Sequence, residues 1–206
     1  MKKIHSIIFF FFISLNGFYV SNLYSQIDNT IIGKVGNSII TSIDLQNEII
    51  TNLVINKQEI NQASINNSKN FAMKNLINKS IKRQEIEKFQ IKNYNNKDLD
   101  DYIEKISKNF DTDSDGLREM FNNYNISYDS LVEKFEVELL WNTLIFTIYR
   151  NQTNVNIIDV ENEIKKIKED RSDEELKNIR QKILNRKKEE KLNLFSRSHF
   201  SNLENS

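Results

Sequence analysis

Three features of the sequence predict a mostly helical fold with a small β-hairpin near the N-terminus and a long C-terminal helix packing back on it. Apolar residues recur at i+3 and i+4 spacings over most of the chain beyond Phe71, as they do in amphipathic helices. The 206 residues include no proline and only four glycines, so helices lack obligate breakers and must end at caps or turns. Runs typical of strands are confined to residues 31–40.

The first 25 residues have the pattern of a secretory signal peptide. Residues 2 and 3 are lysines, and they precede a short apolar run over residues 7–15. A small residue, Ser25, precedes Gln26, and we expect cleavage between these two residues. The chain from Gln26 onward would then reside in the periplasm.

An uncleaved membrane anchor is the alternative for the same segment. Residues 4–23 reach the length of a spanning helix, about 20 residues, only by including several polar side chains. Cysteine is absent from the chain, which fits an oxidising envelope compartment and excludes disulfides and thiolate metal sites. We expect export with cleavage and keep inner-membrane anchoring as the alternative.

A hairpin and a capped helix are expected at the start of the mature chain. The runs Ile31–Val35 and Ser38–Ile40 flank Gly36-Asn37, a two-residue turn signal. Thr41 follows, with Asp44 three residues later, and this pair is close to a capping box. The sequence therefore predicts a helix that begins at Thr41.

The stretch Asn52–Asn70 is polar and rich in asparagine. We expect it to hold the tail of the first helix and a loose, partly disordered connection. A second helix is then expected from Phe71, on the apolar residues Phe71, Met73, Leu76, Ile77, Ile81 and Ile86.

Five further helices are expected downstream. Their ranges are about Asp98–Phe110, Gly116–Tyr124, Ser127 to about Ile148, Val155–Ile167, and Ser172 to about Leu203. The helix that Ser127 caps is apolar over more than one face, so we expect it at the centre of the domain. We assign residues 26–170 to one helical domain and residues 171–206 to a C-terminal helix that completes the same module.

One stretch resembles a metal-binding loop. Asp111, Asp113 and Asp115, followed by Gly116, match the first half of a calcium loop, which supplies carboxylates at alternate positions. The twelfth position is Asn122 where a bidentate glutamate is required. We expect a turn between two helices and keep a calcium site as the alternative.

The sequence offers no candidate catalytic or cofactor-binding residues. It has no cysteine, no G-x-S-x-G nucleophile motif and no phosphate-binding glycine loop, and its two histidines lie near opposite ends. Its 29 basic and 29 acidic residues would become 27 and 29 after loss of the lysines at 2 and 3, a charge of −2, which argues against nucleic-acid binding. We expect four aromatic residues to belong to the core and not to a ligand site: Phe71, Phe121, Phe135 and Trp141.

Several segments, taken in order, resemble a known chaperone family. They are Ile32–Thr41 with Ile43–Leu45, Met73–Ile91, Asp98–Phe110, Gly116–Tyr124, Ser127–Leu140 and Val155–Glu161. Over roughly residues 30 to 165 they are similar to the hairpin, the helices and the closing segment of SurA-type periplasmic chaperones. The resemblance implies a SurA N-terminal-like helical domain, with the last helix packing back on it.

The sequence departs from the family pattern after the closing segment. A parvulin-type prolyl isomerase domain normally follows there, but only Lys165–Asp173 separates the segment from the last helix. That helix, with Ile183 and Leu192, is similar to the family's C-terminal helix. The resemblance therefore implies both halves of the chaperone module without the isomerase.

The resemblance implies a non-enzymatic, ATP-independent periplasmic holdase that binds unfolded outer-membrane β-barrel proteins during outer-membrane assembly. The assembly machinery of that membrane is a further expected partner, and no cofactor is expected. Two alternatives stay open: a membrane-anchored or scaffold protein of an envelope complex, and a peptidyl-prolyl isomerase by family. The sequence does not identify the client-binding residues, because core and groove positions share one pattern.

Overall fold

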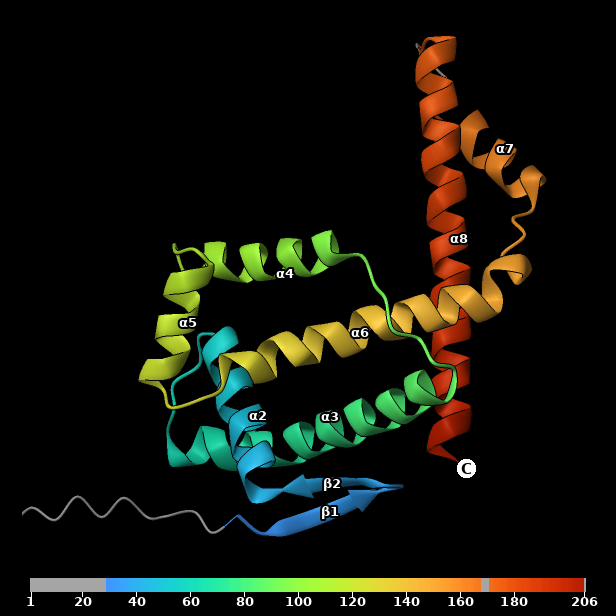
Figure 1. The fold of residues 1–206 in the computed structure, drawn as a ribbon. Helices are drawn as coiled ribbons and strands as arrows, with labels where there is room; N and C mark the ends of the chain where they lie inside the picture. The colour runs from blue at the N-terminus through green and yellow to red at the C-terminus, as the bar shows by residue number, and fades with distance from the viewer. Residues whose placement is uncertain (1–28, 168–170, 206) are drawn as a thin grey trace, which may run out of the picture.

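The computed structural model describes residues 29–167 and 171–205, and most of them are helical (Figure 1). A two-stranded antiparallel hairpin comes first, and the long helix α8 comes last and packs on the rest, as predicted. The elements are β1 (Ile31–Val35), β2 (Ser38–Thr41), α2 (Ser42–Ile55), α3 (Gln62–Lys88), α4 (Asn96–Asn109), α5 (Ser114–Asn123), α6 (Tyr128–Tyr149), η1 (Arg150–Gln152), α7 (Ile157–Lys165) and α8 (Asp173–Glu204).

Helix α6 runs through the centre of the molecule (Figure 1). It packs against α3 on one side and α4 on the other, and the C-terminal part of α8 crosses its end. We call residues 29–152 the body, and α7 with residues 173–187 of α8 the arm, which projects away from the body (Figure 1). The prediction that the helix after Ser127 is central is confirmed.

Aromatic contacts join α8 to the body. The indole Nε1 of Trp141 donates a hydrogen bond to Ser196 Oγ at 2.8 Å, and its ring packs edge-on against Phe200. His199 lies between Tyr149, at 2.9 Å from the hydroxyl, and the buried carboxylate of Glu85, at 3.2 Å. Burial of apolar side chains and the hydrogen bonds from Tyr149 through His199 to Glu85 therefore fix this end of α8.

Three predicted helix starts are confirmed, and at each of them the first predicted residue caps the helix. Thr41 and Asp44 form the expected capping box at the start of α2. Ser127 caps α6 by accepting a hydrogen bond from Ser130 N at 3.1 Å. Ser172 caps α8, and Glu175 completes a second capping box there.

The prediction of a loose connection over Asn52–Asn70 is wrong in extent. Helix α2 continues to Ile55 and α3 begins at Gln62, so the link is short. Asn61 caps α3 by accepting a hydrogen bond from Ser64 N at 2.9 Å. Ile65 packs against the buried cluster that Ile49 and Leu53 of α2 form with Ala72 of α3, and this packing outweighs the polar composition.

The aromatic prediction is confirmed at three positions and wrong at one. Trp141 and Phe121 are buried, and Phe135 packs on the core and stacks on Tyr102 at 5.3 Å between ring centroids. Phe71, by contrast, is 60% exposed on α3. Its neighbour Ala72 takes the buried position, so the apolar face of α3 is offset from the predicted one.

The predicted signal peptide and the alternative membrane anchor both fall within residues 1–25, which lie outside the described residues. The expected cleavage site between Ser25 and Gln26 lies outside the described residues. Within residues 29–167 and 171–205, no helix combines the length and apolarity that crossing a bilayer requires.

Candidate functional site

An open apolar groove lies between the hairpin, α2 and the N-terminal part of α3. We call it the hairpin groove, and its volume is about 460 Å³. Five aliphatic side chains make up most of its wall, and the remaining lining residues are short or flexible polar ones. The lining residues are Ile32, Ser42, Leu45, Gln46, Ile49, Ile50, Ile65 and Lys69.

Helix α2 supplies the floor of the groove because its lining residues share one helical face. They occupy positions 42, 45, 46, 49 and 50, which follow i, i+3, i+4, i+7 and i+8. The capping box fixes where this face begins: Asp44 N donates to Thr41 Oγ1 at 3.2 Å, and Thr41 N donates to Asp44 Oδ2 at 2.8 Å. Ile49 is buried, while Leu45 and Ile50 are half-buried and open to the groove.

The hairpin supplies the rim at Ile32. Ser42 N donates to Thr30 O at 2.9 Å, which ties the start of β1 to the start of α2. Gly36, with φ of +54°, occupies the first position of the two-residue turn, where a left-handed conformation favours glycine. The side-chain amide of Gln84 on α3 donates to Val35 O, so the turn end of the hairpin is also held.

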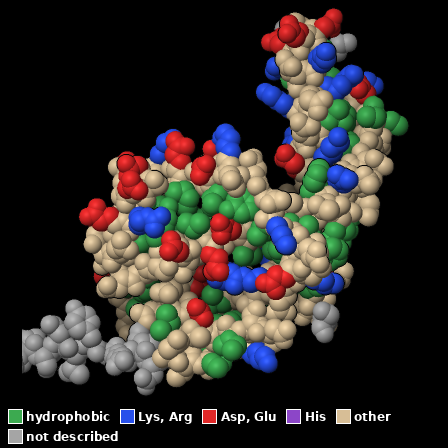
Figure 2. All heavy atoms as spheres, in the orientation of Figure 1, with side chains coloured by type: hydrophobic (Ala, Val, Ile, Leu, Met, Phe, Trp, Pro, Cys, Tyr) green, Lys and Arg blue, Asp and Glu red, His purple; other side chains and the backbone are tan. Residues whose placement is uncertain are grey.

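Further exposed aliphatic residues surround the groove. Ile31, Ile39 and Ile43 belong to the hairpin and the first turn of α2, and each is exposed. Hydrophobic side chains are visible at the lower edge of the body, where the hairpin lies (Figure 2). A second apolar area lies between α4 and α6, where Tyr102 stacks on Phe135 (Figure 2). Exposed apolar surface of this kind marks binding sites for apolar partners.

One lysine lines the hairpin groove, and a second lies on β1 two residues beyond Ile32. These residues are Lys69 and Lys34, respectively, and both side chains are exposed. Neither forms an ion pair with any residue of the described ranges. The nearby carboxylate of Asp44 is engaged in the capping box. An occupant of the groove with a carboxylate would therefore meet the unneutralised ammonium group of Lys69.

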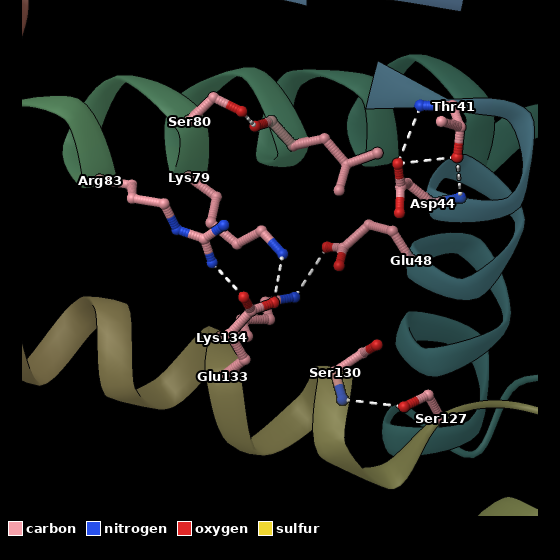
Figure 3. A network of polar contacts seen from close by, with 11 residues as sticks. Thr41, Asp44, Glu48, Lys79, Ser80, Arg83, Ser127, Ser130, Glu133 and Lys134 are labelled. Atoms are coloured by element: carbon pink, nitrogen blue, oxygen red, sulfur yellow. Dashed lines mark hydrogen bonds and ion pairs between the residues drawn. The ribbon is translucent and has the colours of Figure 1, made fainter. Parts of the chain in front are cut away.

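A network of ion pairs joins α2, α3 and α6 (Figure 3). Glu48 on α2 accepts from Lys134 Nζ on α6 at 2.7 Å. Glu133 on α6 accepts from Lys79 Nζ at 3.1 Å and from Arg83, both on α3. Partial burial opposes ionisation of Glu133, but the two cations outweigh it and lower the pKa of this carboxyl.

This network is part of the scaffold and offers no reactive group. A small cavity of about 250 Å³ beside it is lined by Lys79, Lys82 and Lys134, and each of these ammonium groups is ion-paired. The Asn78 Oδ1 atom is buried here without a partner among the described residues. The lysines are thus committed to holding the three helices together.

The three aspartates of the calcium-like stretch lie at the turn between α4 and α5. Asp113 caps α5, because its Oδ1 accepts from Gly116 N at 2.9 Å. Asp111 and Asp115 are exposed, and Asp115 lies in the first turn of α5. Across the described ranges, no group of three or more histidine and carboxylate side chains could hold a metal ion.

The hairpin groove was not identified from the sequence. Leu45, Ile49 and Ile50 showed a helical spacing, but that spacing is the same for a wall that faces a groove as for one that faces the core. Ile65 lay in the asparagine-rich stretch, where its packing on α2 was not expected. The sequence did contain one signal that could have identified the groove. Apolar residues occur at helical spacing on both sides of the short polar link between α2 and α3.

No family model matches the sequence, and neither a curated protein nor a solved structure matches it.

Proposed function

We propose that this chain is an ATP-independent periplasmic holdase that binds unfolded outer-membrane β-barrel proteins. The hairpin groove carries the proposal, because it is an open surface lined mainly by aliphatic side chains and bordered by exposed isoleucines. Such a surface binds apolar segments of many sequences, since it offers few polar groups that demand a particular partner. The absence of a candidate nucleophile in the sequence favours binding without catalysis.

An aggregation assay tests this function. The protein, expressed from Met1 and purified, is mixed with a urea-unfolded outer-membrane β-barrel protein, which is diluted without ATP and followed by light scattering. We expect suppression at near-stoichiometric amounts. If the protein is folded and helical yet aggregation proceeds as without it, the holdase function is wrong.

A pair of matched double variants assigns the activity to the groove. Ile32→Asn with Ile65→Asn places amides in the hairpin groove, whereas Ile157→Asn with Ile158→Asn changes exposed isoleucines of α7. Because Ile65 also packs on α2, circular dichroism first checks that the groove variant keeps the helical content of the unmodified protein. We expect the first variant to lose most of the suppression and the second to retain it. Equal loss in both variants would show that general surface apolarity, and not the groove, protects the client.

The arm supports a second candidate function, that of a scaffold in an envelope complex. A groove of about 610 Å³ lies between α7 and α8, lined by Ile167, Ile179 and Ile183 together with charged residues. The arm that carries this groove projects from the body (Figure 1). A stable partner recovered from envelope extracts by the unmodified chain, but not by Ile179→Asn, would support the scaffold function.

A further inference from the structure

The outer edge of β1 is free of backbone partners within the described residues. The sheet has two strands, so β1 pairs only with β2 in this part of the chain. Val35 and Ser38 close the two-residue turn as a hydrogen-bonded pair, and antiparallel pairs alternate. The next pair, Lys34 with Ile39, is then of the other kind, and the amide and carbonyl of Lys34 point away from β2.

An exposed strand edge is a template for another strand, and proteins usually block it. The common protective features are a very short strand, a lysine or proline on the edge, a bulge, or a covering helix or loop. β1 is short and carries Lys34, which limits pairing, but the chain has no proline and no other described element bonds to this edge through its backbone. The bulge between Ile31 and Gly33 lies at the beginning of the strand, so the segment next to the turn keeps a regular edge.

The free edge is continuous with the hairpin groove. Ile32 belongs to β1 and also lines the groove, where it lies with Leu45 and Ile65. An extended chain that pairs with β1 would therefore leave the strand at the groove. Side chains of a strand alternate between two faces, so every second residue of such a chain would be presented to one side.

Charge complementarity restricts the occupant further. Lys34 lies on the edge strand and Lys69 on the groove wall, and neither has a carboxylate partner among the described residues. A segment that carries a glutamate or aspartate between apolar residues would neutralise one of these ammonium groups. A helical occupant would leave the edge amide of Lys34 unused, since its own backbone groups are paired internally.

We propose that the hairpin binds its client by strand addition: an extended segment with alternating aliphatic or aromatic residues and a carboxylate pairs with the free edge of β1 and continues into the hairpin groove. This inference rests on the proposed holdase function and specifies the conformation and composition that the site accepts. Main-chain hydrogen bonds to β1 supply affinity that does not depend on sequence, and the groove and lysines supply the preference.

The probe is a dye-labelled peptide of ten residues that alternates valine and phenylalanine with threonine and contains one glutamate. Binding is measured by fluorescence anisotropy to the protein, to Lys34→Pro and to Lys34→Gln. Proline removes the outward amide but no hydrogen bond to β2, because the pair of Lys34 with Ile39 is not hydrogen-bonded. Glutamine removes only the charge.

We expect Lys34→Pro to weaken peptide binding about tenfold and Lys34→Gln about threefold. With the glutamate of the peptide replaced by glutamine, the effect of Lys34→Gln should disappear. A peptide N-methylated at alternate residues, used with the unmodified protein, should bind as weakly as the parent peptide binds Lys34→Pro. This last arm needs no change to the protein, so it holds even where the proline variant fails to fold.

The outcomes separate strand addition from the holdase function. If Lys34→Pro and N-methylation leave binding unchanged while Ile32→Asn with Ile65→Asn abolishes it, strand addition is wrong and the groove function stands. If the unmodified protein neither binds the peptide nor suppresses aggregation, both proposals fail. A dimer in analytical ultracentrifugation that Lys34→Pro dissociates, without peptide binding, would assign the edge to a second copy of the chain and overturn the proposal.

Discussion

Glu133 pairs with two cations in the ion-pair network, Lys79 and Arg83. Lys79 and Arg83 lower the pKa of its carboxyl despite partial burial. A carboxyl with a lowered folded-state pKa contributes stability above its unfolded value, ordinarily 4.5, and loses that contribution as the pH falls through the folded value. The three-helix junction in Figure 3 should therefore weaken in acid.

Glu133→Gln should be less stable than the unmodified protein at pH 7, and the difference should shrink below pH 4.5. Urea unfolding at pH 7 and at lower pH, followed by circular dichroism, measures this difference. Glu119→Gln, at an exposed glutamate of α5, is the control and should show no such change. A Glu133→Gln deficit that stays constant with pH would exclude the network as its cause.

The two glycines of the hairpin should respond oppositely to alanine. At Gly36, φ is +54° and an added Cβ would lie 2.3 Å from Oε1 of Gln84, so Gly36→Ala should destabilise by about 1 to 2 kcal/mol. At Gly33 the nearest atom would be 3.8 Å away, in ordinary contact, so Gly33→Ala should be neutral or stabilise by about 0.5 kcal/mol. Urea unfolding of both variants gives the comparison, and equal effects would contradict the turn geometry.

At the scale of elements, α7 depends on one side of α8 for its packing. Val160 and Ile164 of α7 form a small cluster with Ile183 of α8, and this cluster is separate from the body. Ile183→Ala should therefore open the arm locally, with a local cost of about 2 to 4 kcal/mol.

Hydrogen exchange measured by mass spectrometry checks this expectation. Ile183→Ala should accelerate exchange in α7 and leave the slow amides of α3 and α6 unchanged. Ile145→Ala, at a buried position of α6, is the control and should accelerate exchange throughout the body. Accelerated exchange of α3 and α6 in Ile183→Ala would show that arm and body unfold together.

Most elements were predictable because their ends carry local signals. Thr41, Ser127 and Ser172 each precede an apolar helical pattern, and each caps the helix that follows. The start of α3 was missed because its first turns are polar and are held by packing of Ile65 on α2. A local pattern does not show such long-range packing.

At the scale of the molecule, the candidate site was not predictable for a similar reason. The hairpin groove is assembled from β1, α2 and α3, and its existence depends on how closely these elements approach. The spacing of apolar residues shows which face of a helix is apolar, but it does not show whether another element covers that face. Ile32 and Ile65 are therefore identified as neighbours only by the fold.

Export can be checked on the whole protein. We expect the chain expressed from Met1 in a bacterial host to appear in the periplasmic fraction with Gln26 as its first residue. Intact-mass spectrometry of that fraction gives the N-terminus directly. A full-length mass in the membrane fraction would instead support the anchored alternative.

The single helix α8 has a mechanical consequence. Its 32 residues span about 48 Å, and its C-terminal part packs on the body through Trp141 and its neighbours, whereas its N-terminal part packs on α7. From Leu192 to Asp173 the helix rises about 29 Å, so a change in its angle at the contact with the end of α6 would produce the largest displacement at Asp173. A tilt of about 10° at that contact would displace the tip by about 5 Å and would change the distance between arm and body.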